Sequence, residues 1–477
     1  MTPSDWRITV DKGKELAKNT IILTIGKICT QFLTFLLMPL YTAVLSTEEY
    51  GTVDAILTYV SLLLPLVFLQ MDQALFRFLI DARKDKVQSK SIFTTTIVFT
   101  VMQMLIATVI FGVVQFFISS SVKWYLLLNL FASILSSMML QTARGFGNNT
   151  TYAMGSLLSA STQIGCNILF LVVFKFGMAG MLLATALGQL LAAAFVFLKM
   201  RLHRYLDKTA FTTGELKRLV KYSAPLVPNA LCWWAINASD RLIVVNFLGA
   251  AANGLLAVGH KFSSIYITVY NIFNLSWTES AALHMHDEDR DEFFTDVITN
   301  MFKLFMCAGI GLIAIMPFLF PIFVDESFHE AYGLIPLFVL ASMMNVVIGL
   351  YSVIYVALRR TDMIAKTSLY SGIISIVTHL SLLPFIGLYA APTASTVAFG
   401  TMAVYRYFDM KKYVNVPLKL KWIILFAAMY CVATWSYFCG NVYIQAGVLA
   451  VIAVVALALN WGTIKQYLDV LLKKVKR

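Results

Sequence analysis

Charged residues are scarce in this sequence, at 13% of 477 residues, whereas hydrophobic residues make up 59%. A soluble core cannot bury that much apolar surface, so most of the chain must face lipid or other membrane helices. Apolar runs long enough to cross a hydrocarbon layer of ~30 Å recur between residues 21 and 463, with short polar breaks between them. The composition indicates a membrane domain throughout. It argues against an enzyme of the kind that needs a sizeable external loop or soluble domain to hold an acceptor.

Signals for several other classes are also missing. The first 18 residues are charged and have no apolar core before a cleavage site, so we expect no signal peptide. The six cysteines show no C-x-x-C spacing and no neighbouring histidine, which predicts packing thiols and no metal site. The net charge of +12 comes from basic residues in membrane-flanking loops, which favours contacts with anionic membrane lipids over nucleic-acid binding.

Fourteen transmembrane helices are predicted, with twelve as the alternative. If both termini lie on one side of the membrane, the loops on the opposite side contain only two cations, Lys123 and Lys175. The other basic loops, whose cations include Arg406, lie on the same side as the termini. The positive-inside rule makes that side cytoplasmic, so both termini are expected in the cytoplasm. The expected spans are 19–45, 51–80, 91–118, 122–144, 150–174, 179–200, 222–248, 252–281, 297–323, 331–358, 364–386, 389–410, 421–439 and 442–463.

Two of the predicted external loops resemble each other. Residues 45–51 join the first and second spans, and residues 248–254 join the seventh and eighth, with leucine first and glycine last in both. We infer two six-helix lobes, residues 1–210 and 211–412, followed by an appended helix pair and a basic tail in residues 413–477. Duplicated lobes that face one another are typical of transporters that work by alternating access.

Polar side chains recur at steps of three and four residues in six spans, so in each span they share one helix face. Ionised side chains inside a membrane normally face a wet cavity or a partner. Because the surplus is positive and hydroxyls and amides accompany it, such a lumen suits a substrate that carries phosphate and sugar. The predicted substrate-binding residues are Lys27, Gln31, Arg77, Arg144, Asn237, Arg241, Lys261 and Arg359.

Four carboxylates lie in or beside the same stripes, and a carboxylate in a low dielectric can titrate or bind a cation. The ion-coupling residues that we predict, for H⁺ or Na⁺, are Asp54, Asp72, Asp240 and Glu279. No catalytic residue and no bound cofactor is predicted. Simpler roles stay open: Ser and Thr stripes also serve helix packing, Lys27 or Lys261 can pair with an acid, and the arginines can extend to the cytoplasmic surface.

Ordered motifs between residues 14 and 412 carry a family resemblance. They include Met38-Pro-Leu-Tyr41, Glu49-Tyr-Gly51, Arg144-Gly-Phe-Gly147 and Ser239-Asp-Arg-Leu242. On these motifs the chain resembles the polysaccharide-biosynthesis flippases of the MOP transporter superfamily. The resemblance implies a MATE-like fold. It further implies export of undecaprenyl-pyrophosphate-linked repeat units for surface polysaccharides such as O-antigen, with a polymerase or another polysaccharide-assembly protein as partner.

Three alternatives stay open. The appended pair is similar to that of the lipid II flippase branch, and the same fold includes antiporters of cationic drugs, although a cationic lumen would repel a cation. A membrane glycan polymerase or transferase is the third alternative. The longest external break, at residues 325–332, is predicted to be a capped loop between helices.

Overall fold

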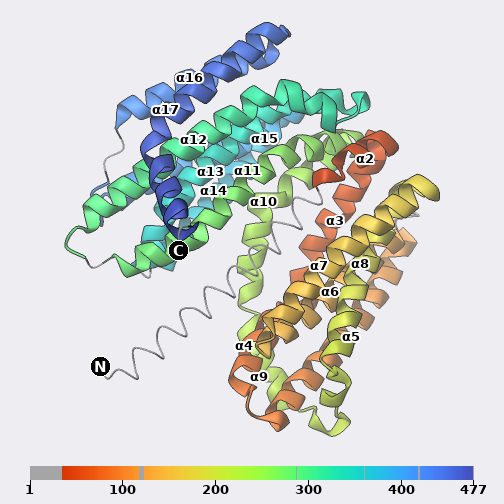
Figure 1. Cartoon of the computed structure of the whole chain (residues 1–477). Helices are drawn as coiled ribbons and strands as arrows, with labels where there is room; N and C mark the ends of the chain where they lie inside the picture. Colours follow the sequence, from red (N-terminus) through yellow and green to blue (C-terminus); the bar gives the residue numbers. More distant parts are fainter. Residues whose placement is uncertain (1–34, 118–122, 286, 359, 417–418, 476–477) are drawn as a thin grey trace. The chain divides into compact units, whose positions relative to one another are not determined.

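The computed structural model describes residues 35–117, 123–285, 287–358, 360–416 and 419–475 (Figure 1). In these ranges nearly every residue is helical and no strand occurs. Ten segments of the described chain are long and apolar enough to cross a membrane, and one of them, Met363–Met410, contains two helices. The prediction of an all-α polytopic membrane protein is confirmed. The predicted first span, 19–45, lies mostly outside the described residues.

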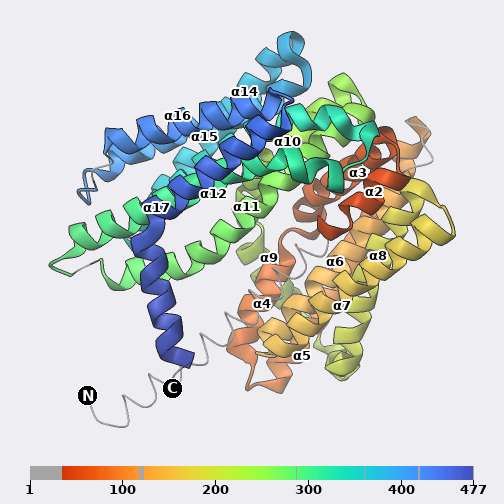
Figure 2. The same cartoon turned by 45° about the horizontal axis from the view of Figure 1, so that its top comes forward.

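By compactness the chain divides after Gly254. In the first unit, Figures 1 and 2 show the long helices α5 to α8 running alongside one another. A π-helical turn, Leu169–Val173, extends α7. The α-helices of this unit are α2 (Met38–Val44), α3 (Thr47–Phe68), α4 (Met71–Ala82), α5 (Lys86–Phe117), α6 (Lys123–Gly145), α7 (Asn149–Ile168), α8 (Gly177–Lys199), α9 (Thr213–Ser223), α10 (Leu226–Leu248) and the first residues of α11 (Ala250–Leu283).

Residues 255–477 form the second unit. Its α13 packs against α15, and α15 against α14, while α16 and α17 both lie on α12. The helices are the rest of α11, α12 (Arg290–Phe323), α13 (Ile335–Ala357), α14 (Thr361–Ile386), α15 (Ala390–Met410), α16 (Leu420–Phe438) and α17 (Val442–Val475). The observed helices agree with the predicted spans to within a few residues at most ends. The lobe boundary near residue 210 stays a prediction.

A pair of tyrosines attaches the appended helix α16 to the 3₁₀-helix η4 (Glu326–Leu334). The rings of Tyr332 and Tyr437 stack with centroids 4.0 Å apart. Each hydroxyl donates to the backbone carbonyl of the other residue, over 3.1 Å from Tyr332 and 2.7 Å from Tyr437. Because the hydroxyls are satisfied, two large rings can be packed here without an orphaned polar group.

The segment at residues 325–332, predicted to be a capped loop, is capped as expected, but from residue 326 onward it forms the 3₁₀-helix η4. The side chain of Asp325 accepts hydrogen bonds from the backbone N–H of Ser327 at 3.0 Å and from its hydroxyl at 2.8 Å. These two bonds hold the pKa of the Asp325 carboxyl below its usual range. The acidic residue at this position therefore has a local capping role.

The predicted second span is broken into two helices. α3 ends at Phe68, three residues after Pro65, and α4 begins at Met71. Between them Leu69 and Gln70 both have positive φ, at 51° and 54°, a region that residues other than glycine rarely occupy. Packing holds the break in place, because Leu75 and Leu79 of α4 are fully buried in the same apolar cluster as Met138 of α6.

Candidate functional site

The two repeated loop motifs contact each other through their matched glycines. A Cβ atom added to Gly51 on α3 would lie 1.8 Å from the carbonyl oxygen of Ala250, and one added to Gly254 on α11 would lie 2.1 Å from that of Thr47. Any side chain at either position would therefore clash with backbone. The glycines allow the first turns of α3 and α11 to cross at backbone contact distance.

An ion pair lies one turn along α3 from this crossing. A guanidinium N–H of Arg241 on α10 donates to Oδ1 of Asp54 at 3.0 Å. The amide of Asn253 donates to Oδ2 of Asp54 at 3.2 Å and to the carbonyl oxygen of Gly51 at 2.9 Å. The side chains of Arg241 and Asp54 keep 28% and 18% of their surface exposed. Asp54 is thus placed between two donors on two helices, and the pair stays accessible.

The same helix presents further polar and aromatic groups. Trp233 and Asn237 are exposed and precede Arg241 by eight and four residues, so all three share one face of α10. The Asn237 amide donates to the Trp233 carbonyl of its own helix at 2.8 Å, and the Trp234 indole N–H donates to the hydroxyl of Ser61 on α3 at 3.0 Å. This face of α10 combines a cation, an amide and an aromatic ring, a set that can bind phosphate and stack on a sugar.

Two other predicted arginines lie elsewhere in the first unit. Arg77 is exposed and forms a 2.7 Å ion pair with Asp81 one turn along α4. Arg144 lies over the ring of Phe76, 4.6 Å from its centroid, and donates to Gln141 at 3.0 Å. Both have local partners on α4 or α6, and substrate contact by either stays a prediction.

The predicted ion-coupling acids differ in their surroundings. Asp72 is buried at 9% exposure on α4 and accepts hydrogen bonds of 3.0 Å from Ser137 of α6 and from Gln73. Asp54 has a cationic partner, as described above. Asp240 is half-buried on α10, and Glu279 is exposed on α11. Their part in coupling stays a prediction.

The described structure does not place the remaining predicted site residues relative to this group. Lys261 is half-buried on α11 in the second unit. Lys27, Gln31 and Arg359 lie outside the described residues. A chamber shared by the cations of both lobes therefore stays a prediction, and the group that the structure brings together is Asp54, Arg241 and Asn253.

A buried arginine in the second unit was not singled out from the sequence. Arg406, counted above with the cytoplasmic cations, is only 2% exposed on α15. Its guanidinium donates to the hydroxyl of Thr367 on α14 at 2.7 and 3.1 Å, to that of Ser368 at 3.4 Å, and to that of Ser352 on α13. The arginine therefore connects three helices. Arg406 lies at the end of an apolar run, close to Lys411 and Lys412. A cation that only sets membrane topology would have the same position, so nothing in the sequence indicated that Arg406 is buried.

Replacing Arg406 with Gln should destabilise the protein. The shorter amide cannot reach three helices, which leaves buried hydroxyls without their donor and lowers the free energy of unfolding by ~2 kcal/mol. Thermal unfolding of the purified protein in detergent measures this. Lys366→Gln is the control, because that lysine is exposed on α14. Equal melting temperatures for the two variants would contradict the role assigned to Arg406.

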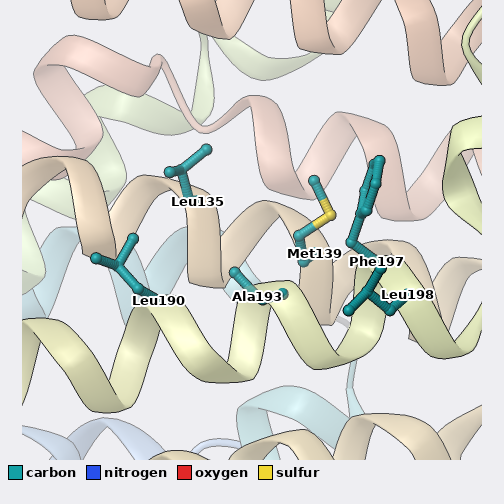
Figure 3. A pocket seen from close by; sticks show the side chains of 7 residues that line it. Leu135, Met139, Leu190, Ala193, Phe197 and Leu198 are labelled. Carbon is teal, nitrogen blue, oxygen red and sulfur yellow. The ribbon is translucent and has the colours of Figure 1, made fainter.

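A groove of about 350 Å³ on the surface of the first unit is apolar, in contrast to the polar face of α10. Figure 3 shows its lining side chains, which come from α6 and α8 and are all apolar: Leu135, Met139, Leu190, Ala193, Ala194, Phe197 and Leu198. It offers no donor for a phosphate. The α10 face is accordingly the better candidate for binding a charged substrate.

The profile of a family described as "Polysaccharide biosynthesis protein" matches residues 16–278. No curated protein matches the sequence. Several solved membrane transporters share the fold at 11 to 14% sequence identity.

One is the lipid II flippase MurJ in an inward closed conformation, at 14% identity and a TM-score of 0.68, covering 93% of this chain and 99% of that one. A second is an inward-facing multidrug resistance MATE family transporter of the MOP superfamily, at 11% identity and a TM-score of 0.66, covering 80% and 95%. A third is a MOP superfamily transporter from Pyrococcus furiosus, at 13% identity and a TM-score of 0.54, covering 83% and 96%. The predicted MATE-like fold is confirmed.

Proposed function

Since this chain belongs to the polysaccharide biosynthesis protein family, we propose that it is a flippase for undecaprenyl-pyrophosphate-linked oligosaccharide repeat units. The family match covers more than half of the chain, and the fold is that of transporters. In this proposal the protein acts in the cytoplasmic membrane of a bacterium with both termini inside, and it moves its substrate without altering it chemically.

The observation that supports the substrate class best is the accessible face of α10. Arg241 supplies a forked, permanently charged donor for a phosphate, while Asn237 and Trp233 on the same face suit the hydroxyls and ring of a sugar. A cationic drug would instead need unpaired carboxylates, and Asp54 is already held by Arg241 and Asn253.

The mechanism that we propose is alternating access. The pyrophosphate and sugar head enters a cavity open to the cytoplasm, the prenyl tail stays in lipid, and a change of conformation exposes the head on the other side. The crossing of Gly51 and Gly254 joins the two repeated motifs by contact rather than by a covalent link. Because only non-covalent contacts hold it, this crossing can separate when the protein changes conformation. Coupling of the change to H⁺ or Na⁺ through Asp72 or another of the four acids is part of the proposal.

A lipid II flippase is the second candidate. The similarity to the solved lipid II flippase extends over 93% of this chain, and the chain has the appended helices α16 and α17. Both substrates carry a pyrophosphate and a sugar on a prenyl chain, so the chemistry of the α10 face suits either. Only a comparison of the two lipids as substrates can separate these candidates.

The test is reconstitution of the full chain into liposomes that contain a fluorescent undecaprenyl-pyrophosphate-linked oligosaccharide. Translocation is followed as the fraction of label that a membrane-impermeant quencher bleaches. We expect bleaching of the inner-leaflet label in the presence of the protein, and none with empty liposomes. Parallel assays with labelled lipid II and with a cationic dye complete the experiment. Movement of the dye alone would refute the proposed substrate class, and preference for lipid II would select the second candidate.

A further inference from the structure

We infer that Asp54 is an internal competitor for the anion-binding position at Arg241, and that a substrate phosphate must displace its carboxylate in order to bind. The inference rests on the proposed function, in which Arg241 meets the phosphate. Beyond that function, the inference assigns to Asp54 two effects. Asp54 limits the affinity of Arg241 for the phosphate, and it links binding at Arg241 to the crossing of Gly51 and Gly254.

The geometry of the pair supports this exchange. A carboxylate and a phosphate oxygen occupy the same kind of position on a guanidinium, and both are recognised through charge-assisted N–H···O bonds. Asp54 holds such a position with a 3.0 Å bond. The Arg241 side chain is 28% exposed, so an incoming anion can reach it, whereas the buried Arg406 at 2% exposure is closed to such contact. The pair is therefore weak enough and open enough for an incoming anion to replace one partner.

The second contact of Asp54 connects this exchange to the helix crossing. Asn253 donates to Asp54 and also to the carbonyl oxygen of Gly51, the residue that packs against Ala250 and Gly254. Displacement of Asp54 from Arg241 removes the bond between α3 and α10 next to this crossing. The same event that admits the anion would thus weaken the contact between the repeated motifs. The substrate would therefore bind more tightly to the conformation in which the crossing is weakened than to the conformation in which it is intact. A ligand can drive a conformational change only through such a difference in affinity.

The experiment is a binding titration of the purified full chain with farnesyl pyrophosphate, a soluble prenyl pyrophosphate, with farnesol as the uncharged probe. Asp54→Asn keeps the size of the side chain and an acceptor for Asn253 while removing the competing charge. We expect this variant to bind farnesyl pyrophosphate about fivefold more tightly than the parent, which corresponds to the loss of a partly exposed ion pair. Farnesol binding should not change.

Two further variants make the result specific. Asp81→Asn removes the acid that pairs with the exposed Arg77 and should leave the affinity unchanged. In an Arg241→Gln background, Asp54→Asn should give no gain, because the position for which the two anions compete is gone. If Asp54→Asn does not give folded protein, as judged by a monodisperse elution profile, Asp54→Ser is the replacement.

Unchanged or weaker binding by the folded Asp54 variant, or an equal gain with Asp81→Asn, would overturn the inference. The result is independent of the flippase assay. Translocation by the parent without tighter binding by Asp54→Asn would leave the proposed function standing and remove this inference alone. Tighter binding by Asp54→Asn without any translocation by the parent would support the competition between Asp54 and the anion and would remove the proposed flippase function.

Discussion

Replacing Arg241 with Gln should reduce the translocation of the lipid-linked oligosaccharide at least about tenfold in the reconstituted assay. The variant loses the charge-assisted bonds that we assign to the substrate phosphate, and each such bond to a charged group contributes ~1.5 to 3 kcal/mol. Arg241→Lys should keep part of the activity, since an ammonium retains the charge but not the forked geometry. The measurement is the initial rate of label translocation per folded protein.

Arg218→Gln is the matched control for this prediction. Arg218 was not predicted to bind substrate, its side chain is 42% exposed, and its partner, Glu215, lies one turn away on the same helix, α9. Exposed pairs of this kind contribute little, and Arg218 is not on the α10 face, so we expect translocation within about twofold of the parent. Equal losses for both variants would mean that the two arginines act alike, and would remove the distinction that the structure makes between them.

Replacing Gly51 with Ala should cause a large loss of stability. The new Cβ would lie 1.8 Å from the carbonyl oxygen of Ala250, 2.6 Å from the backbone nitrogen of Gly254 and 2.8 Å from the Ala250 carbonyl carbon. Because these are backbone atoms, no side-chain rotation can relieve the clash, and the helices must separate. We expect a loss of at least about 3 kcal/mol, visible as a lower melting temperature in detergent.

Gly112→Ala is the control for the glycine crossing. A Cβ atom at Gly112, in the C-terminal part of α5, would meet nothing within 4 Å, so the change should be neutral or slightly stabilising through helix propensity. The double variant Gly51→Ala and Gly254→Ala should lose less stability than the two single variants together, because one separation of the helices accommodates both methyl groups. Additive losses would show that the two glycines do not share one contact.

Several local features of the fold could be predicted because they depend on neighbouring residues. Apolar runs and flanking charges indicated the helices α5 to α8 and α10 to α16 with errors of a few residues at most ends. The short helix α9 was not predicted, and α17 extends to Val475, beyond the predicted end at residue 463. The cap at Asp325 followed from a short polar break between two such runs. The break at Leu69 and Gln70 could not be predicted in the same way. Neither residue is a typical helix breaker, and their positive φ angles are maintained by the packing of α4 against α6.

The site was predicted in part. Asp54 and Arg241 were both identified as polar residues in apolar helices, but they were given separate tasks, ion coupling and substrate binding. The structure pairs them. Arg406 was passed over because a basic residue at the end of an apolar run is ordinarily a solvated anchor, and only the positions of α13 and α14 around it show that it is buried.

The sequence by itself determined that the chain is a multi-pass membrane protein, where most of its apolar helices lie, and that its two halves carry matching loop motifs. These properties follow from hydropathy and from spacings within about 30 residues. The tertiary structure alone decided that the matched glycines touch and that Arg241 meets Asp54 across 187 residues of sequence. The reason is physical: helical periodicity specifies which face of a helix is polar, but the partner of that face depends on how helices cross, and the crossing is set by packing along the whole chain.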